Sequence, residues 1–89
     1  MNPRFQELRA EIAANDRRIV EAVNERLRLV DELWRLKSEL GLELIDRGRE
    51  RELVAELERA NGGPLSQRAL ERLVATLLDL TKQELEQRD

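Results

Sequence analysis

Residues 3 to 40 read PRFQELRAEIAANDRRIVEAVNERLRLVDELWRLKSEL. This stretch contains no Pro or Gly after its first residue, and Leu, Ala, Glu and Arg fill most positions, so helix propensity is high throughout. Apolar side chains recur mainly at spacings of three, four and seven residues, which puts them on one face of a helix. We therefore predict one long amphipathic helix. Its apolar face consists of Phe5, Ile12, Ile19, Val23, Val30, Leu33 and Trp34.

Charged residues also fall on this apolar face, namely Arg9, Asp16, Arg26 and Lys37. Unpaired charges are rarely left in a protein core, because removing an ion from water is costly. Arg26 and Lys37 lie near the centre of the face. Arg9 lies near its margin, where the alkyl stem could rest on the core while the guanidinium stays in water. We therefore expect an anionic partner for the central cations.

Two further helices are predicted behind the long one. Gly41 ends the first helix, and Asp46 is placed to cap a second helix that runs to Ala60. The sequence NGGP stops that helix, and Ser66 caps a third one that reaches roughly Gln87. The pattern predicts an all-α chain with a long, a short and a medium helix.

Composition excludes several classes of function. The 89 residues are 40% hydrophobic, 39% charged and 2% aromatic, which is typical of a helical bundle and of one domain, residues 1–89. The net charge of −3, with acids and bases interleaved, argues against a nucleic-acid surface. The absence of Cys and His removes disulfides, thiolate nucleophiles, the usual zinc ligands and an imidazole base. No apolar run is long enough for a bilayer and no signal segment is visible, so we expect a cytoplasmic protein.

The length of the first helix predicts the oligomeric state. A helix of about 38 residues is roughly 57 Å long at 1.5 Å per residue. A compact chain of this size has a radius of gyration of about 12 Å, so its diameter is roughly 30 Å. Half of the apolar face would stay in water in a monomer. We therefore predict an intertwined two-fold homodimer in which the long helices pack against each other.

The spacing of the cations predicts a shared site for a small dianion. Arg9 and Arg26 lie about 26 Å apart along the helix, whereas Arg26 and Lys37 lie about 16 Å apart. Antiparallel long helices would bring Arg9 of one chain to Arg26 and Lys37 of the other. Two arginines and a lysine suit a compact dicarboxylate. The start of the second helix adds one cation and two hydroxyl acceptors: Arg49, Asp46 and Glu50.

Each of the remaining candidates also has a structural interpretation. Asp46 and Glu50 are acids in the first turn of a helix, where the helix dipole favours them. Thr81 on an apolar stripe is commonly a tolerated small residue, and Trp34 is interpreted as a core residue. The many other Glu and Arg residues form a solvated face.

Taken together, the chain resembles the all-helical class of chorismate mutases over nearly its whole length. Each motif by itself is weak, but all of them occur in order and at the family's spacings. The resemblance rests on Leu8-Arg9 with Ile12 and Asp16, on Glu25-Arg26 and Lys37, on the spaced signature Asp46, Arg49 and Glu50, and on Gly63-Pro64 before the third helix.

The resemblance implies an isomerase that converts chorismate to prephenate on the shikimate route to phenylalanine and tyrosine. The reaction is an intramolecular Claisen rearrangement, which needs no nucleophile, proton transfer, metal or cofactor. By similarity the catalytic residues would be Lys37, Arg26 and Glu50. Arg26, with Arg9 from the partner chain, would bind the two carboxylates of the substrate, and Lys37 would bond its ether oxygen.

The resemblance assigns further binding roles along the chain. Arg49 would support a carboxylate, and Asp46 and Glu50 would hold the ring hydroxyl. Thr81 would replace the serine that is common at its position.

The chain departs from the family pattern in its last helix. The family usually has Gln or Glu one turn beyond that serine, where this chain has Leu85. Either a small register shift brings Glu84 or Gln83 inward, or this interaction at the ether oxygen is weakened. We include Glu84 among the predicted binding residues. Arg47 also stands where the family often has Pro.

Two other functions remain open at this point. An isochorismate pyruvate lyase shares the fold and the cation set, although the Asp46 signature and Glu50 favour the mutase. A non-catalytic helical module that regulates a larger biosynthetic enzyme is the second alternative. Neither nucleic acid nor a membrane is expected as a partner.

Overall fold

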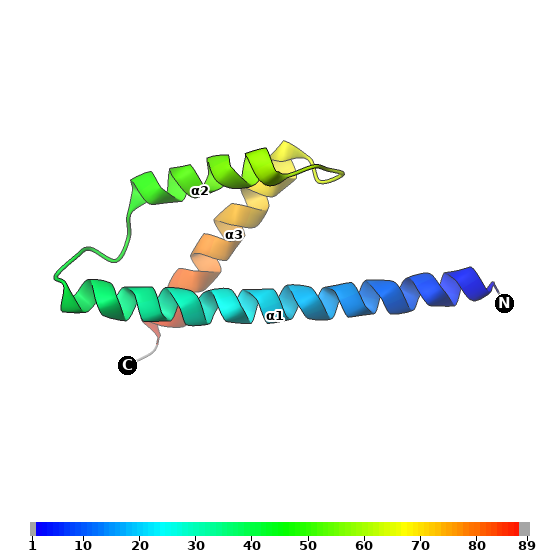
Figure 1. The fold of residues 1–89 in the computed structure, drawn as a ribbon, viewed down its shortest axis with the longest axis horizontal. Coiled ribbons are helices and arrows are strands. Elements are labelled where there is room, and N and C mark those ends of the chain that lie inside the picture. The colour runs from blue at the N-terminus through cyan, green and yellow to red at the C-terminus, as the bar shows by residue number, and fades with distance from the viewer. Residues whose placement is uncertain (1, 88–89) are drawn as a thin grey trace.

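The computed structural model describes residues 2–87, which form three helices joined by two connectors (Figure 1). Helix α1 spans Pro3–Glu39, α2 spans Arg47–Ala60 and α3 spans Gln67–Glu86. No strand occurs within these described residues. The long, short and medium helices predicted from the sequence are confirmed, and their ends agree to within one residue.

Side-chain caps start each helix. The carboxylate of Asp46 accepts a hydrogen bond from the Arg49 backbone N at 3.0 Å, and the hydroxyl of Ser66 accepts one from the Ala69 backbone N at 3.1 Å. Asn2 caps α1 in the same way. Each cap satisfies a backbone donor that has no partner inside the helix, which confirms the two predicted starts of α2 and α3.

Helix α1 ends in a left-handed glycine turn. Gly41 has a φ of 71°, a conformation that is unfavourable for residues with a Cβ atom. Its backbone N donates to the Ser38 carbonyl at 3.2 Å, and the Leu42 N donates to the Lys37 carbonyl at 2.8 Å. This is a Schellman motif, and it turns the chain back toward the start of α2.

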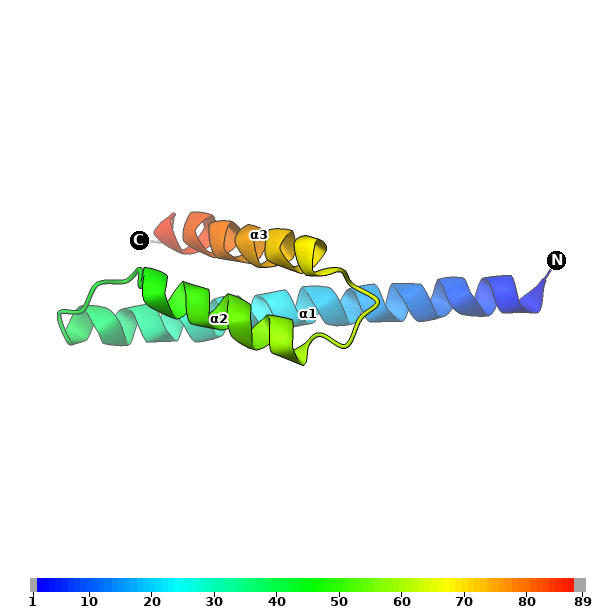
Figure 2. The same cartoon turned by 90° about the horizontal axis from the view of Figure 1, so that it is seen from above.

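The three helices do not all pack on one another. Within residues 2–87, the backbone of α3 lies close to both α1 and α2, whereas the backbones of α1 and α2 do not come close to each other. Both shorter helices lie alongside the C-terminal half of α1, and its N-terminal half projects alone (Figures 1 and 2). The chain therefore measures 60 × 29 × 16 Å, and its radius of gyration of 16.8 Å exceeds the ~12 Å of a compact chain of this length.

The buried side chains of the described residues all belong to α3. Val74 is the most deeply buried, with 1% of its surface exposed. Neither α1 nor α2 contains a buried residue. The core of the isolated chain is consequently small and sits on one face of α3. Its members are Leu70, Val74, Thr81 and Leu85.

The predicted apolar face of α1 is largely open to solvent in the single chain. Phe5, Ile12 and Ile19 expose 52%, 58% and 54% of their surface. A row of large apolar side chains on a projecting helix is the pattern that calls for a second chain. No helix within the described residues combines the length and apolarity needed to cross a bilayer.

Candidate active site

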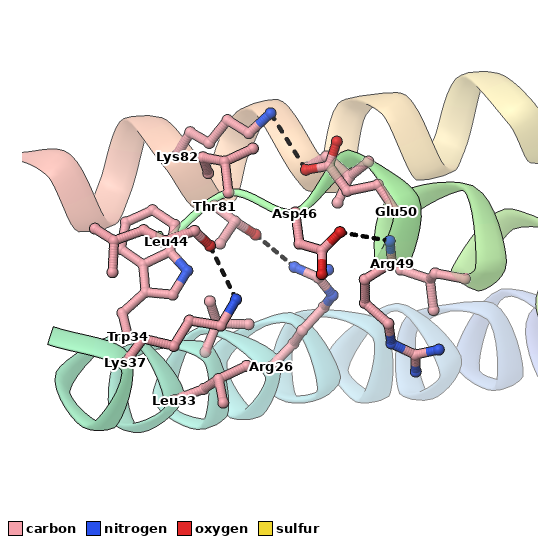
Figure 3. Close-up of a pocket in the computed structure, with 14 residues that line it drawn as sticks. Arg26, Leu33, Trp34, Lys37, Leu44, Asp46, Arg49, Glu50, Thr81 and Lys82 are labelled. Carbon is pink, nitrogen blue, oxygen red and sulfur yellow. Dashed lines mark hydrogen bonds and ion pairs between the residues drawn. The ribbon is translucent and has the colours of Figure 1, made fainter. Parts of the chain in front are cut away.

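A cavity of about 190 Å³ lies between the C-terminal half of α1, the α1–α2 connector, the start of α2 and the second half of α3 (Figure 3). Six of the eight binding residues predicted from the sequence line it, and they come from all three helices or their caps. These are Arg26, Lys37, Asp46, Arg49, Glu50 and Thr81.

Arg26 reaches from α1 across to α3. Its Nη1 donates a hydrogen bond to Oγ1 of Thr81, which in turn donates to the Leu77 carbonyl at 2.7 Å. Thr81 is buried, with 5% of its surface exposed, so its hydroxyl fixes one edge of the guanidinium. A guanidinium carries five N–H donors, so Arg26 keeps a free fork for a carboxylate.

Lys37 lies about three helical turns further along α1. Its Nζ donates to the carbonyl oxygen of Leu44 at 3.1 Å, in the connector that the glycine turn folds back (Figure 3). This bond holds the ammonium at the cavity. A backbone carbonyl is a neutral partner, so the positive charge of Lys37 is not cancelled.

Neither central cation has an anionic partner in the part of the chain that the structure describes. Within residues 2–87, no carboxylate forms an ion pair with Arg26 or Lys37. Both side chains are only partly exposed. The anionic partner that the sequence predicts for these cations is thus not a carboxylate of residues 2–87, and a ligand could take this role. The cavity therefore presents two uncompensated positive charges to a ligand.

The start of α2 supplies the acids of the cavity. One oxygen of Asp46 is engaged by the helix cap, which leaves the other available. The Oε2 of Glu50 pairs with Nζ of Lys82 on α3 at 3.4 Å (Figure 3). Two carboxylates with free lone pairs suit a hydroxyl donor on a ligand.

Arg49 lines the cavity but is occupied by acids of its own helix. Its Nη1 lies 3.2 Å from Glu52 and 3.0 Å from Glu56. The hydrogen bond to Glu56, followed by that to Glu52, raises the pKa of Arg49 above its ordinary value, so it stays charged at any physiological pH. It must leave these partners before it can support a ligand carboxylate.

Arg9 and Glu84 do not line the cavity of this chain. Arg9 lies on the projecting half of α1, with its Cζ 5.1 Å from the centre of the Phe5 ring. Glu84 is exposed, whereas Leu85 points inward with 6% exposure. Helix α3 runs without a break to Glu86, so the register shift that would bring Glu84 inward does not occur here.

Sequence reasoning missed one charged residue and most of the apolar wall. Lys82 lines the cavity and pairs with Glu50. Its position directly after Thr81, at the edge of the apolar stripe of α3, could have identified Lys82 from the sequence. Trp34, interpreted as a core residue, lies on the cavity wall instead. The other apolar wall residues are Val30, Leu33, Leu44, Ile45, Leu53 and Leu78.

The charges of the lining match a dianion. Four cations face two carboxylates, a formal excess of two positive charges. The apolar wall lowers the local dielectric and strengthens the attraction for an anion. The cavity is thus suited to a compact apolar ring that carries two carboxylates and a hydroxyl.

Comparison with known proteins agrees with this geometry. Residues 8–86 match the family model described as chorismate mutase type II. The chorismate mutase of Thermus thermophilus in its form II structure is 36% identical, with a TM-score of 0.89 over 97% of this chain and 98% of that chain. Its form I structure is 37% identical, with a TM-score of 0.84 over 88% and 98%. No curated protein sequence matches significantly.

The family match covers α1 from Leu8 onward, all of α2 and α3, and every residue that lines the cavity. The alignment also covers 98% of each of the two similar chains, so no large part of their fold is missing from this chain. The chain therefore belongs to the chorismate mutase type II family.

Proposed function

We propose that this chain converts chorismate to prephenate. The observation that carries the proposal is the pair of cations, Arg26 and Lys37, that line one apolar-walled cavity without a carboxylate partner among the described residues. Chorismate is a compact dicarboxylate with a ring hydroxyl and an ether oxygen. Each of these groups finds a complementary side chain in the cavity.

The reaction is a rearrangement within one molecule. The C–O bond of the ether breaks while a C–C bond forms between the side chain and the ring, so no atom leaves and no proton is transferred. Catalysis then reduces to holding the compact conformer and stabilising the negative charge that develops on the ether oxygen. A site without His or Cys is sufficient for this chemistry.

Arg26 and Lys37 provide these two effects. Arg26, held at one edge by Thr81, offers its free fork to a substrate carboxylate. Lys37 exchanges the Leu44 carbonyl for the ether oxygen, where its charge stabilises the transition state more than the ground state. One donor placed in this way typically contributes about 3 to 4 kcal/mol.

The start of α2 provides orientation. Asp46 and Glu50 accept from the ring hydroxyl, and Arg49 turns from Glu52 and Glu56 toward a carboxylate when substrate is bound. The cavity lining and the family to which the chain belongs support these proposed roles.

The working unit that we propose is an intertwined homodimer with two equivalent sites. Arg9 is absent from the cavity of its own chain, and the exposed apolar face of α1 is suited to pack against a second α1. Arg9 of the partner subunit then completes the clamp on the second carboxylate. The cytoplasm stays the predicted compartment.

The test is a chorismate assay in which loss of substrate and appearance of prephenate are both measured. Lys37→Met keeps the alkyl stem and removes the charge, so we expect turnover to fall at least about 100-fold while the helical content is unchanged. Arg68→Met on the exposed start of α3 is the matched control and should stay near wild type. No prephenate from the wild type, or salicylate from isochorismate instead, would refute the proposal.

A further inference from the structure

Lys82 has no role in the family resemblance, yet it stands at the candidate site. It follows the buried Thr81 on α3 and lines the same cavity as Arg26 and Lys37. Its Nζ lies 3.4 Å from Oε2 of Glu50, and the two side chains expose only 32% and 25% of their surface. The pair is thus held partly out of solvent at the edge of the cavity.

The pair between Lys82 and Glu50 is distinctive in its connectivity. It is the one ion pair that joins two different helices within residues 2–87, because every other pair lies within a single helix. Within the same residues, the backbone of α2 lies close to α3 and not to α1. Lys82 therefore acts at the contact that fixes α2 relative to the cavity.

The pair also leaves Glu50 able to bind. A carboxylate has two oxygens with about four acceptor positions, and Lys82 occupies a single oxygen. Without the ammonium, the carboxylate of Glu50 would have no side-chain partner within the described residues and would gain rotamer freedom. A ligand hydroxyl would then have to order the acceptor that it binds.

We propose that Lys82 is a positioning residue that orients the carboxylate of Glu50 toward the ring hydroxyl of the substrate. The inference rests on the proposed function, since Glu50 is the acceptor there. The hydroxyl does not react, so its contact with Glu50 exists both in the bound substrate and in the transition state. Loss of the orienting charge accordingly weakens binding and affects KM rather than kcat.

The experiment compares KM and kcat for chorismate across a small set of variants. Lys82→Met retains the stem and should raise KM about fivefold, the effect of a partly exposed ion pair, while kcat stays within about twofold. Lys82→Arg restores the charge and should bring KM back to within about twofold of wild type. Arg72→Met removes a cation from an exposed position of the same helix and serves as the matched control.

A double variant separates positioning from direct contact. If Lys82 acts through Glu50, then adding Lys82→Met to Glu50→Gln should change KM by less than about twofold. If the two single effects on KM multiply in the double variant, Lys82 acts on the substrate itself and the inference is overturned. So would a Lys82→Met enzyme with wild-type KM.

Two other outcomes also lead to a decision. If Lys82→Met fails to fold, as judged by circular dichroism, Lys82→Gln takes its place, and the same changes in KM and kcat are expected. A wild-type protein that leaves chorismate unchanged overturns the proposed function and this inference with it. An active wild type with an unchanged Lys82 variant overturns the inference alone.

Discussion

The shared active site can be tested by exchanging chains between two inactive variants. Arg9 and Arg26 are 17 positions apart on α1, and a continuous helix separates them by about 26 Å along its axis. No small dicarboxylate spans this distance, so we expect each site to take Arg26 from one chain and Arg9 from the other. Arg9→Ala and Arg26→Ala homodimers should therefore each lose nearly all activity, because every site lacks one half of the clamp.

The magnitude of the recovery on mixing follows from two-fold symmetry. Equal amounts of the two variants are unfolded together and refolded, so that about half of the dimers contain one chain of each kind. In such a dimer one site carries both substitutions and the other carries neither. Activity should then recover to roughly a quarter of the wild-type value per chain.

A second exchange provides the matched control. Wild type mixed with the double variant Arg9→Ala/Arg26→Ala places one substitution in each site of every mixed dimer. Activity should fall on exchange from about half of the wild-type value to about a quarter. Sites confined to one chain predict no recovery in the first exchange and no fall in the second. Either result, with mixed dimers verified by native mass spectrometry, would refute the shared site.

Two further predictions follow from single hydrogen bonds. Thr81→Val removes the hydroxyl that accepts a hydrogen bond from Arg26 and should lower kcat/KM about tenfold, whereas Thr81→Ser keeps this hydroxyl and should stay near wild type. Equal activity of the two variants in a chorismate assay would contradict the role of the hydroxyl. Ser66→Ala removes the cap of α3 and should destabilise the protein by about 1 kcal/mol, with kcat unchanged. Ser66→Asp should keep the stability of the wild type. If the denaturant titrations of the wild type and both variants coincide, the cap does not stabilise the protein.

The helices were predictable from the sequence because their signals are local. Propensity fixed the extent of α1, while Asp46 and Ser66 marked the starts of α2 and α3. The oligomeric prediction followed from the length of the first helix and from its apolar face, and the projecting half of α1 is consistent with it (Figure 1).

The site was predictable in its cations and less so in its contacts. Arg26 and Lys37 stood out because charge on an apolar face needs an explanation. The bond from Arg26 to Thr81 and the pair between Lys82 and Glu50 join residues on different helices, so no periodicity within one helix could show them. At the end of α3 the single chain exposes Glu84 and buries Leu85, so it does not show the inward shift of Glu84.

Because the backbones of α1 and α2 do not come close to each other within residues 2–87, we expect a bound substrate to have a mechanical role. In the free chain the two helices face each other across the cavity, and within residues 2–87 the backbone of α2 lies close to α3 alone. A ligand that bonds cations on α1 and acids on α2 becomes the bridge between them. Part of its binding free energy would then be used to immobilise α2, so we expect the rigidity of this helix to rise with the occupancy of the site.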